Sequence, residues 1–259
     1  MIAAGTRYAM GTLLRVEAEA AVAGAAARAR DLIFVEIQRL EALLSRFRPD
    51  SDVSRINRAA GASPVRVAPE TSAAIAAALD FASASDGAFS PAVDGDHRAV
   101  RLDPAAGTVF LPVPGTSLDL GGIGKGFALD AAMVRARELA ALERVLIDFG
   151  GQLLFWTRDE RPGPVKVAIE NPDGSGAFLG EFEVRRNCSV STSSQAERPG
   201  HLIDRRAAGR VASGAASATV VAPMAVEAEA WSTALFVAGR EGLARLTGRP
   251  DVEAFLFPG

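Results

Sequence analysis

The chain has 259 residues, a formal net charge of −3 and a hydrophobic fraction of 49%. This composition is typical of a globular protein with a substantial core, and the small negative charge gives no electrostatic basis for binding nucleic acid. The single cysteine, Cys188, excludes an intrachain disulfide and a multi-cysteine metal site. The two histidines, His97 and His201, disfavour a zinc centre rich in histidine.

The N-terminal sequence, MIAAGTRYAMGTLLRVEAEA, lacks the charged segment followed by a long apolar stretch that marks a secretory signal. No apolar run approaches the roughly 20 residues of a membrane-spanning helix. We therefore expect no membrane span. The expected location is cytoplasmic for the chain as written, or periplasmic if a leader has been removed from it.

Hydrophobic periodicity in the first half of the chain predicts two long helices joined by short strands and turns. The second helix is bracketed by Pro69 near its start and Gly87 after its end. A loosely alternating segment after the turn at Met10 is expected to be an edge strand. The expected bounds are 12–18 for the edge strand, 23–47 and 70–85 for the helices, 54–60 for a helical turn, and 65–67, 108–111 and 117–120 for strands.

The second half is expected to contain more strands, several of them joined by hairpin-like turns. This order favours an α+β fold, with mixed, largely antiparallel sheets packed with helices, over a doubly wound parallel sheet. No linker divides the chain, so residues 1–259 are expected to form a single domain or two intimately packed halves. The expected bounds are 124 to about 142 and 224–238 for helices, and 144–149, 153–157, 165–170, 178–184, 189–193, 219–222 and 252–257 for strands.

A glycine-rich stretch, LDLGGIGKGFALDAA at 118–132, carries Lys125 at the start of a predicted helix. Glycines let a ligand approach the backbone closely, and the N–H groups at a helix start suit a phosphate. A Walker A loop requires Ser or Thr where Gly126 stands, and a dinucleotide fingerprint requires glycine where Phe127 stands. The stretch is therefore an anion site of neither type, or simply a turn that needs glycine for its dihedral angles.

Candidate metal ligands lie on the helix predicted over 224–238. Glu229 and Thr233 are four residues apart and so share one face, and a carboxylate and a hydroxyl are hard oxygen ligands for magnesium. The alternative is structural, because a glutamate early in a helix favours the helix dipole and a threonine can bond back to a carbonyl.

His201, in a polar loop, is a candidate base that would take a proton from a hydroxyl, or else an ordinary surface histidine. His97 has the weaker claim, since nothing near it in the sequence suggests a role. No G-x-S-x-G motif is present, which disfavours a serine hydrolase.

Taken together, eight ordered segments that cover nearly the whole chain resemble the ApbE family of flavin transferases. They are YAMGT, LSRFRPDSDVSRIN, GAFSPAVDG, LDLGGIGKGFALD, VLIDFGGQL, STSS, HLID and EAEAWST, the last followed by ALFVAG. The resemblance implies an ApbE-like fold and a Mg²⁺-dependent FAD:protein FMN transferase. Such an enzyme moves FMN from FAD onto a Ser or Thr hydroxyl of a target protein and releases AMP.

The resemblance also implies a role for each matching position. The magnesium ion would be held by the backbone carbonyl of Gly122 and the side chains of Glu229 and Thr233, and His201 would act as the base. The implied FAD-binding residues are Met10, Phe47, Ala88, Phe89, Ser90, Asp119 and Lys125.

Several positions depart from the family pattern. Glu229 and Ser90 stand where the family usually has aspartate, Ser194 replaces a glycine, and Gln152 replaces an acidic residue. These departures leave two alternatives open beside the transferase. One is an FAD pyrophosphatase that releases FMN and AMP, and the other is a flavin-binding module without catalysis.

Overall fold

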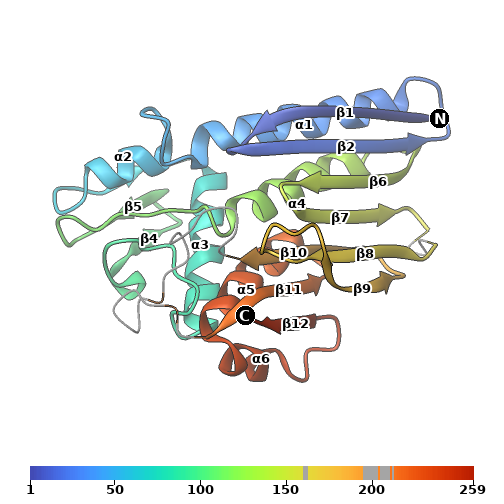
Figure 1. The fold of residues 1–259 in the computed structure, drawn as a ribbon. Helices are drawn as coiled ribbons and strands as arrows, with labels where there is room; N and C mark the ends of the chain where they lie inside the picture. Colours follow the sequence, from blue (N-terminus) through green and yellow to red (C-terminus); the bar gives the residue numbers. More distant parts are fainter. Residues whose placement is uncertain (160–162, 195–203, 205–210, 212) are drawn as a thin grey trace.

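The structure is a computed structural model that describes residues 1–159, 163–194, 204, 211 and 213–259. Its largest element is a seven-stranded antiparallel sheet in the order β1-β2-β6-β7-β10-β11-β12 (Figure 1). The strands are β1 (Ile2–Ala9), β2 (Thr12–Ala20), β6 (Leu142–Phe149), β7 (Gln152–Thr157), β10 (Cys188–Ser194), β11 (Ala215–Ala222) and β12 (Glu253–Pro258).

Three helices form a layer on one face of this sheet. They are α1 (Ala25–Leu44), α4 (Gly124–Arg137) and α5 (Ala225–Ala238). Helix α1 packs on β1 and β2, α5 packs on β10 and β11, and α4 lies between the two helices. A hairpin of β8 (Val165–Glu170) and β9 (Phe178–Val184) covers part of the opposite face through a second, smaller hydrophobic cluster.

A smaller substructure lies at one end of the large sheet (Figure 1). It contains α2 (Asp52–Arg58), α3 (Pro69–Ala84), the 3₁₀ helix η1 (His97–Ala99) and a sheet in the order β3-β5-β4. These strands are β3 (Val65–Arg66), β5 (Thr108–Phe110) and β4 (Arg101–Asp103). The main hydrophobic core runs from the large sheet into this substructure without a break, since Ile56, Ala74 and Val109 belong to the same cluster as Val16 and Ile147.

The expected fold class is confirmed, because antiparallel sheets pack with segregated helices throughout the described chain. Four of the five expected helices agree with α1, α2, α3 and α5 to within a few residues at each end. The hairpin of β8 and β9 has its expected bounds. The reason is that these segments have clear periodicity and turn residues on both sides.

The expected edge strand at 12–18 was wrong. The segment belongs to β2, which is an interior strand between β1 and β6. Strand β1, Ile2–Ala9, takes the edge and was not predicted, because most of its side chains are exposed and give no strict alternation.

Other bounds differ as well. The strand expected over 219–222 begins at Ala215. The segment 117–120 forms only an isolated bridge, between Ala92 and Leu118. The helix from Gly124 ends at Arg137 rather than near 142, because buried Leu142 already pairs with Ala20 as the first residue of β6. Helix α6 (Arg240–Leu246) and strand β4 were not predicted.

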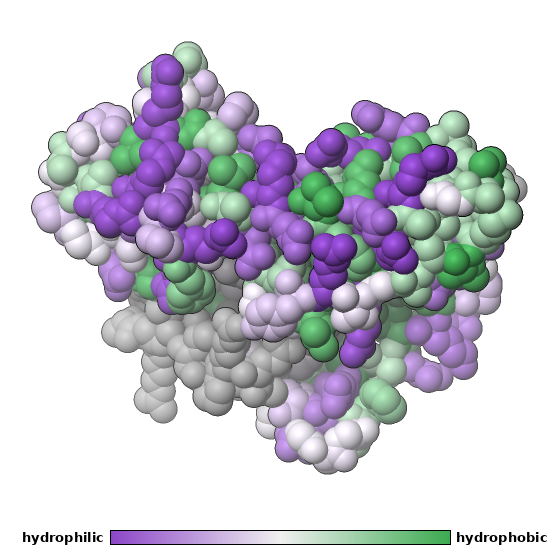
Figure 2. Space-filling model, turned by 90° about the horizontal axis from the view of Figure 1, so that it is seen from above, coloured by the Kyte–Doolittle hydropathy of each residue, from purple (hydrophilic) through white to green (hydrophobic). Residues whose placement is uncertain are grey.

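Within the described ranges, none of the helices combines the length and the apolar character needed to cross a bilayer. On the face seen in Figure 2, strongly hydrophobic side chains lie among hydrophilic ones instead of forming one large patch. Scattered apolar residues of this kind are normal at protein surfaces.

Candidate active site

The glycine-rich turn is fixed from both sides by residues far from it in the sequence. Asn57, on α2, donates a hydrogen bond to the carbonyl of Leu118 (2.9 Å) and accepts one from its N–H (2.7 Å). The N–H of Asp119 donates to the carbonyl of Pro91 (2.8 Å). These bonds place the turn between α2 and the 90–94 segment before α4 begins.

Asp119 stabilises the turn from within. Its Oδ1 accepts a hydrogen bond from the N–H of Gly121 (2.9 Å), and its Oδ2 lies 3.4 Å from Nε of Arg46. The next carbonyl, that of Leu120, accepts the N–H of Gly124 (2.7 Å) as α4 starts. The turn therefore presents the first N–H groups of a helix beside a carboxylate and a guanidinium group.

Helices α4 and α5 approach closely at Gly126. A Cβ atom at this position would lie 2.3 Å from the carbonyl oxygen of Ala225 and 2.7 Å from Cα of Val226. Glycine is therefore required here by space. One turn later, the carboxylate of Asp130 accepts the N–H groups of Ala225 (2.9 Å) and Val226 (2.8 Å), and so caps α5.

Glu229 joins the same two helices through its carboxylate. Its Oε2 accepts the N–H of Gly126 (2.7 Å), and its Oε1 forms an ion pair with Nζ of Lys125. Glu229 is only 3% exposed. A buried carboxylate needs such partners, because an unpaired charge away from water is costly.

Thr233, one turn after Glu229, faces the turn before α4. A Cβ atom at Gly122 would lie 3.5 Å from Oγ1 of Thr233 and 3.2 Å from the ring of Phe89, so these three residues are neighbours. Oγ1 of Thr233 also lies 3.4 Å from Oγ of Ser193 on β10. The structure thus brings Gly122, Lys125, Glu229 and Thr233 to one place.

The donor atoms at this place suit a magnesium ion. A carboxylate, a hydroxyl and a nearby backbone carbonyl are all hard oxygen donors, and Mg²⁺ commonly binds through one or two carboxylates while keeping several waters. No cluster of three or more His, Cys, Asp or Glu side chains occurs within the part of the chain that the structure describes. Of the three implied ligands, Gly122, Glu229 and Thr233, Glu229 is the acidic one, so a metal ion held by these residues would depend on its carboxylate.

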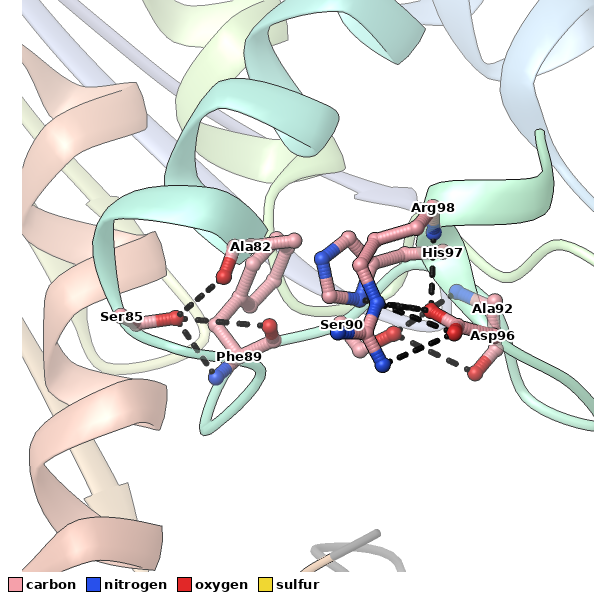
Figure 3. A network of polar contacts seen from close by, with 8 residues as sticks. All are labelled: Ala82, Ser85, Phe89, Ser90, Ala92, Asp96, His97 and Arg98. Carbon is pink, nitrogen blue, oxygen red and sulfur yellow. Dashed lines mark hydrogen bonds and ion pairs between the residues drawn. The ribbon is translucent and has the colours of Figure 1, made fainter. Parts of the chain in front are cut away.

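The segment 88–90 lies against the turn through Phe89, which is buried together with Ala88. Oγ of Ser85 accepts the N–H of Phe89 (3.1 Å), and Oγ of Ser90 accepts the N–H of Ala92 (3.2 Å), as Figure 3 shows. The Ser90 hydroxyl therefore makes the local turn contact that an aspartate in this place would also make.

Phe47 lies just after α1 with 75% of its surface exposed, and the guanidinium of Arg46 stands 4.9 Å from its ring centroid. An exposed aromatic ring beside a cavity is suited to stacking on a planar ligand. The cavity has a volume of about 290 Å³ and is lined by Arg46, Phe47, Pro49, Ser54, Asn57 and Arg58.

Met10 occupies the β1–β2 turn with a positive φ of 46°, and its side chain packs partly buried against the main core. The neighbouring turn approaches it closely, because a Cβ atom at Gly150 would lie 2.6 Å from Oγ1 of Thr12. His201, the expected base, lies outside the described residues. The role of each of these residues stays a prediction.

Asp130 and Asn57 were not assigned roles in the sequence, although both position the site. Asp130 stands in the first turns of α4, where a carboxylate is ordinarily explained by the dipole of its own helix. Its long-range partners, Ala225 and Val226, could not be inferred from spacing. Asn57 gave no signal beyond its place in a short helix.

This geometry is typical of proteins that bind an anionic ligand at a glycine-rich helix start, beside a candidate site for a divalent cation. The family model of the ApbE family matches residues 10–106 and 94–256. The chain belongs to the ApbE family.

The curated relatives that match this chain are named FAD:protein FMN transferases. An FAD:protein FMN transferase of Treponema pallidum is 32% identical over 300 residues, covering 96% of this chain and 83% of the relative. An FAD:protein FMN transferase of Salmonella typhimurium is 27% identical, covering 96% of this chain and 82% of the relative.

Solved structures show the same fold. The ApbE protein of Thermotoga maritima has a TM-score of 0.86 at 24% identity and covers 99% of this chain and 94% of its own. The apo form of the Pseudomonas stutzeri flavinyl transferase ApbE has a TM-score of 0.82 at 21% identity, with coverage of 99% and 90%.

The Asp130 cap leads to a pH prediction. Burial raises the pKa of this carboxyl from 3.8 to about 6, against the opposing effect of its backbone hydrogen bonds. The folded state then holds the proton more tightly than the unfolded state. The contribution of the protonated Asp130 carboxyl to stability is complete below about pH 4 and is lost as the pH rises through about 6. Between these two pH values, each pH unit lowers the free energy of unfolding by roughly 1.4 kcal/mol at most.

We therefore expect the stability of the wild-type protein to fall, relative to the Asp130→Asn variant, between about pH 4 and about pH 7. Urea unfolding of both proteins across this range measures the difference. Parallel pH profiles would show that Asp130 does not titrate in this window.

Proposed function

We propose that this protein is a Mg²⁺-dependent FAD:protein FMN transferase, which moves FMN from FAD onto a Ser or Thr hydroxyl of a target protein. The observation that carries the proposal is the convergence of Lys125, Glu229 and Thr233 on the glycine-rich turn. Relatives that align with nearly the whole chain and bear this name support it.

FAD fits the groups around the turn. Lys125, the α4 N-terminus and Arg46 supply positive charge for a pyrophosphate, and the exposed ring of Phe47 is suited to stacking. The residues that would hold magnesium are Glu229 and Thr233, with the carbonyl of Gly122. Bound magnesium would offset the charge that develops as the bond between the two phosphates breaks.

The chemical step is a phosphoryl-type transfer. The acceptor oxygen forms a new bond to the FMN phosphorus, the bond from that phosphorus to the bridging oxygen breaks, and AMP leaves with the bridging oxygen. The hydroxyl proton passes to a base, for which His201 is our candidate. If water took the place of the acceptor, the same step would release FMN and AMP.

One assay tests the function. The protein is incubated with FAD, Mg²⁺ and a candidate acceptor domain, and the products are examined by mass spectrometry. An FMN adduct on the acceptor, absent with EDTA or with the acceptor hydroxyl replaced by alanine, supports transfer. Free FMN with AMP indicates a pyrophosphatase, and FAD that stays bound and intact indicates a flavin-binding module.

The base is tested separately. We expect His201→Ala to lower the transfer rate by about a hundredfold or more, the usual contribution of a general base, with FAD affinity largely unchanged. Isothermal titration with FAD and adduct formation over time measure the two effects. Loss of FAD binding would instead make His201 a substrate contact.

A further inference from the structure

We propose that Lys125 is an internal counter-ion that a divalent cation displaces. In this inference the Lys125 ammonium neutralises Glu229 in the metal-free protein, and metal binding at Glu229 releases it toward the anionic substrate. The inference rests on the proposed function in taking Glu229 as a metal ligand. Metal loading then comes first and prepares the lysine for the substrate.

The first support is the burial of the pair. The Glu229 side chain is 4% exposed and the Lys125 side chain 24%, so the carboxylate lies at the inner end of the pair and the ammonium at the outer end. Because a buried carboxylate is costly without a positive partner, the metal-free site needs a cation of its own. A lysine at the outer end can leave toward solvent when a metal ion arrives.

The second support is the division of the carboxylate between its two oxygens. Oε2 is held by the N–H of Gly126, and Oε1 is held by the Lys125 ammonium. The backbone contact can persist while the ammonium moves, since the two partners use different oxygens. The carboxylate therefore keeps its position while one cation replaces another.

The third support is the residue type. The chain has 28 basic residues, and of these only Lys125 and Lys166 are lysines. An arginine fork binds a carboxylate in a fixed bidentate geometry, whereas a lysine ammonium is a point charge on a flexible stem. A cation that must exchange partners is better served by lysine, and this chain has one at the site in an arginine-rich context.

Metal binding to the FAD-free protein tests the inference. Lys125→Met keeps most of the length of the stem and removes the charge. We expect it to bind Mn²⁺ about tenfold or more tightly than the wild type does, because the competing ammonium is gone. Mn²⁺ titration followed by electron paramagnetic resonance measures the Kd, and no catalytic step enters the readout. Lys166→Met is the matched control, because Lys166 is exposed and 3.7 Å from Glu181; its Kd should equal that of the wild type.

Thermal unfolding gives a second readout. Metal-free Lys125→Met should unfold at a lower temperature than the wild type, since Glu229 loses its partner, and Mn²⁺ should raise its Tm by more than it raises the wild-type Tm. In the Glu229→Asp background, where the carboxylate is one methylene shorter, the effect of Lys125→Met on the Kd should shrink.

An unchanged or weaker Mn²⁺ affinity in folded Lys125→Met would overturn the inference. That result together with an FMN adduct from the wild-type protein would leave the proposed function standing. Tighter Mn²⁺ binding without any adduct would support the counter-ion exchange and count against the transferase.

Discussion

Replacing Glu229 with alanine is expected to reduce Mg²⁺-dependent FMN transfer by about a thousandfold or more. Glu229 is the one acidic side chain among the implied ligands, and a metal ion contributes several kcal/mol of charge stabilisation, with each 1.36 kcal/mol worth about a factor of ten in rate. The rate of adduct formation at several Mg²⁺ concentrations measures the loss. Excess Mg²⁺ should not restore the rate, because the carboxylate itself is missing.

Two further variants separate the metal role from a structural one. Glu229→Gln keeps an acceptor for the N–H of Gly126 but has no charge, so it should fold and still lose transfer. Glu227→Ala, on the same helix, removes a carboxylate that pairs with Arg249 (3.1 Å) and should leave transfer unchanged. Near-normal transfer by Glu229→Ala would remove this residue from the metal site and leave it a structural role, as the partner of Lys125 and of the N–H of Gly126.

The fold could be predicted where a segment carries its own signal. The hairpin of β8 and β9 surrounds the turn Asn171-Pro-Asp-Gly174, and both strands have their expected bounds. Strand β1 could not be predicted in the same way. It owes its strand conformation to pairing with β2 along its whole length, from Ile2 with Glu19 to Ala9 with Thr12, and not to an apolar pattern of its own.

The site residues also divide into features with a local sequence signal and contacts between residues far apart in the sequence. The sequence placed Lys125 at a helix start and Glu229 beside Thr233 on one helix face, and both elements are present. The ion pair between Lys125 and Glu229 was not foreseen, because its partners are 104 residues apart. The sequence motifs imply a separate ligand for each residue, FAD for the lysine and magnesium for the glutamate. Neither motif predicts that the two side chains neutralise each other.

Helices α4 and α5 pack closely at Gly126, so an added methyl group there is expected to be strongly destabilising. We expect Gly126→Ala to destabilise the protein by about 3 kcal/mol or more and to abolish FAD binding. The new Cβ would lie 2.3 Å from the carbonyl oxygen and 2.5 Å from the carbonyl carbon of Ala225, which are backbone atoms that no side-chain rotation can move away. Relief of the clash requires α4 and α5 to separate. That separation would break the hydrogen bond from the N–H of Gly126 to Glu229 and the hydrogen bonds by which Asp130 caps α5.

Gly124→Ala is the matched control, two residues earlier in the same helix. A Cβ atom there meets nothing closer than Cβ of Leu120 at 4.0 Å, and alanine is a better helix former than glycine. Urea unfolding should therefore show Gly124→Ala at or above wild-type stability and Gly126→Ala far below it. If both variants were equally stable, the contact between α4 and α5 would be looser than the structure shows. Glu229 and Lys125 would then not depend on glycine at 126 for their pairing.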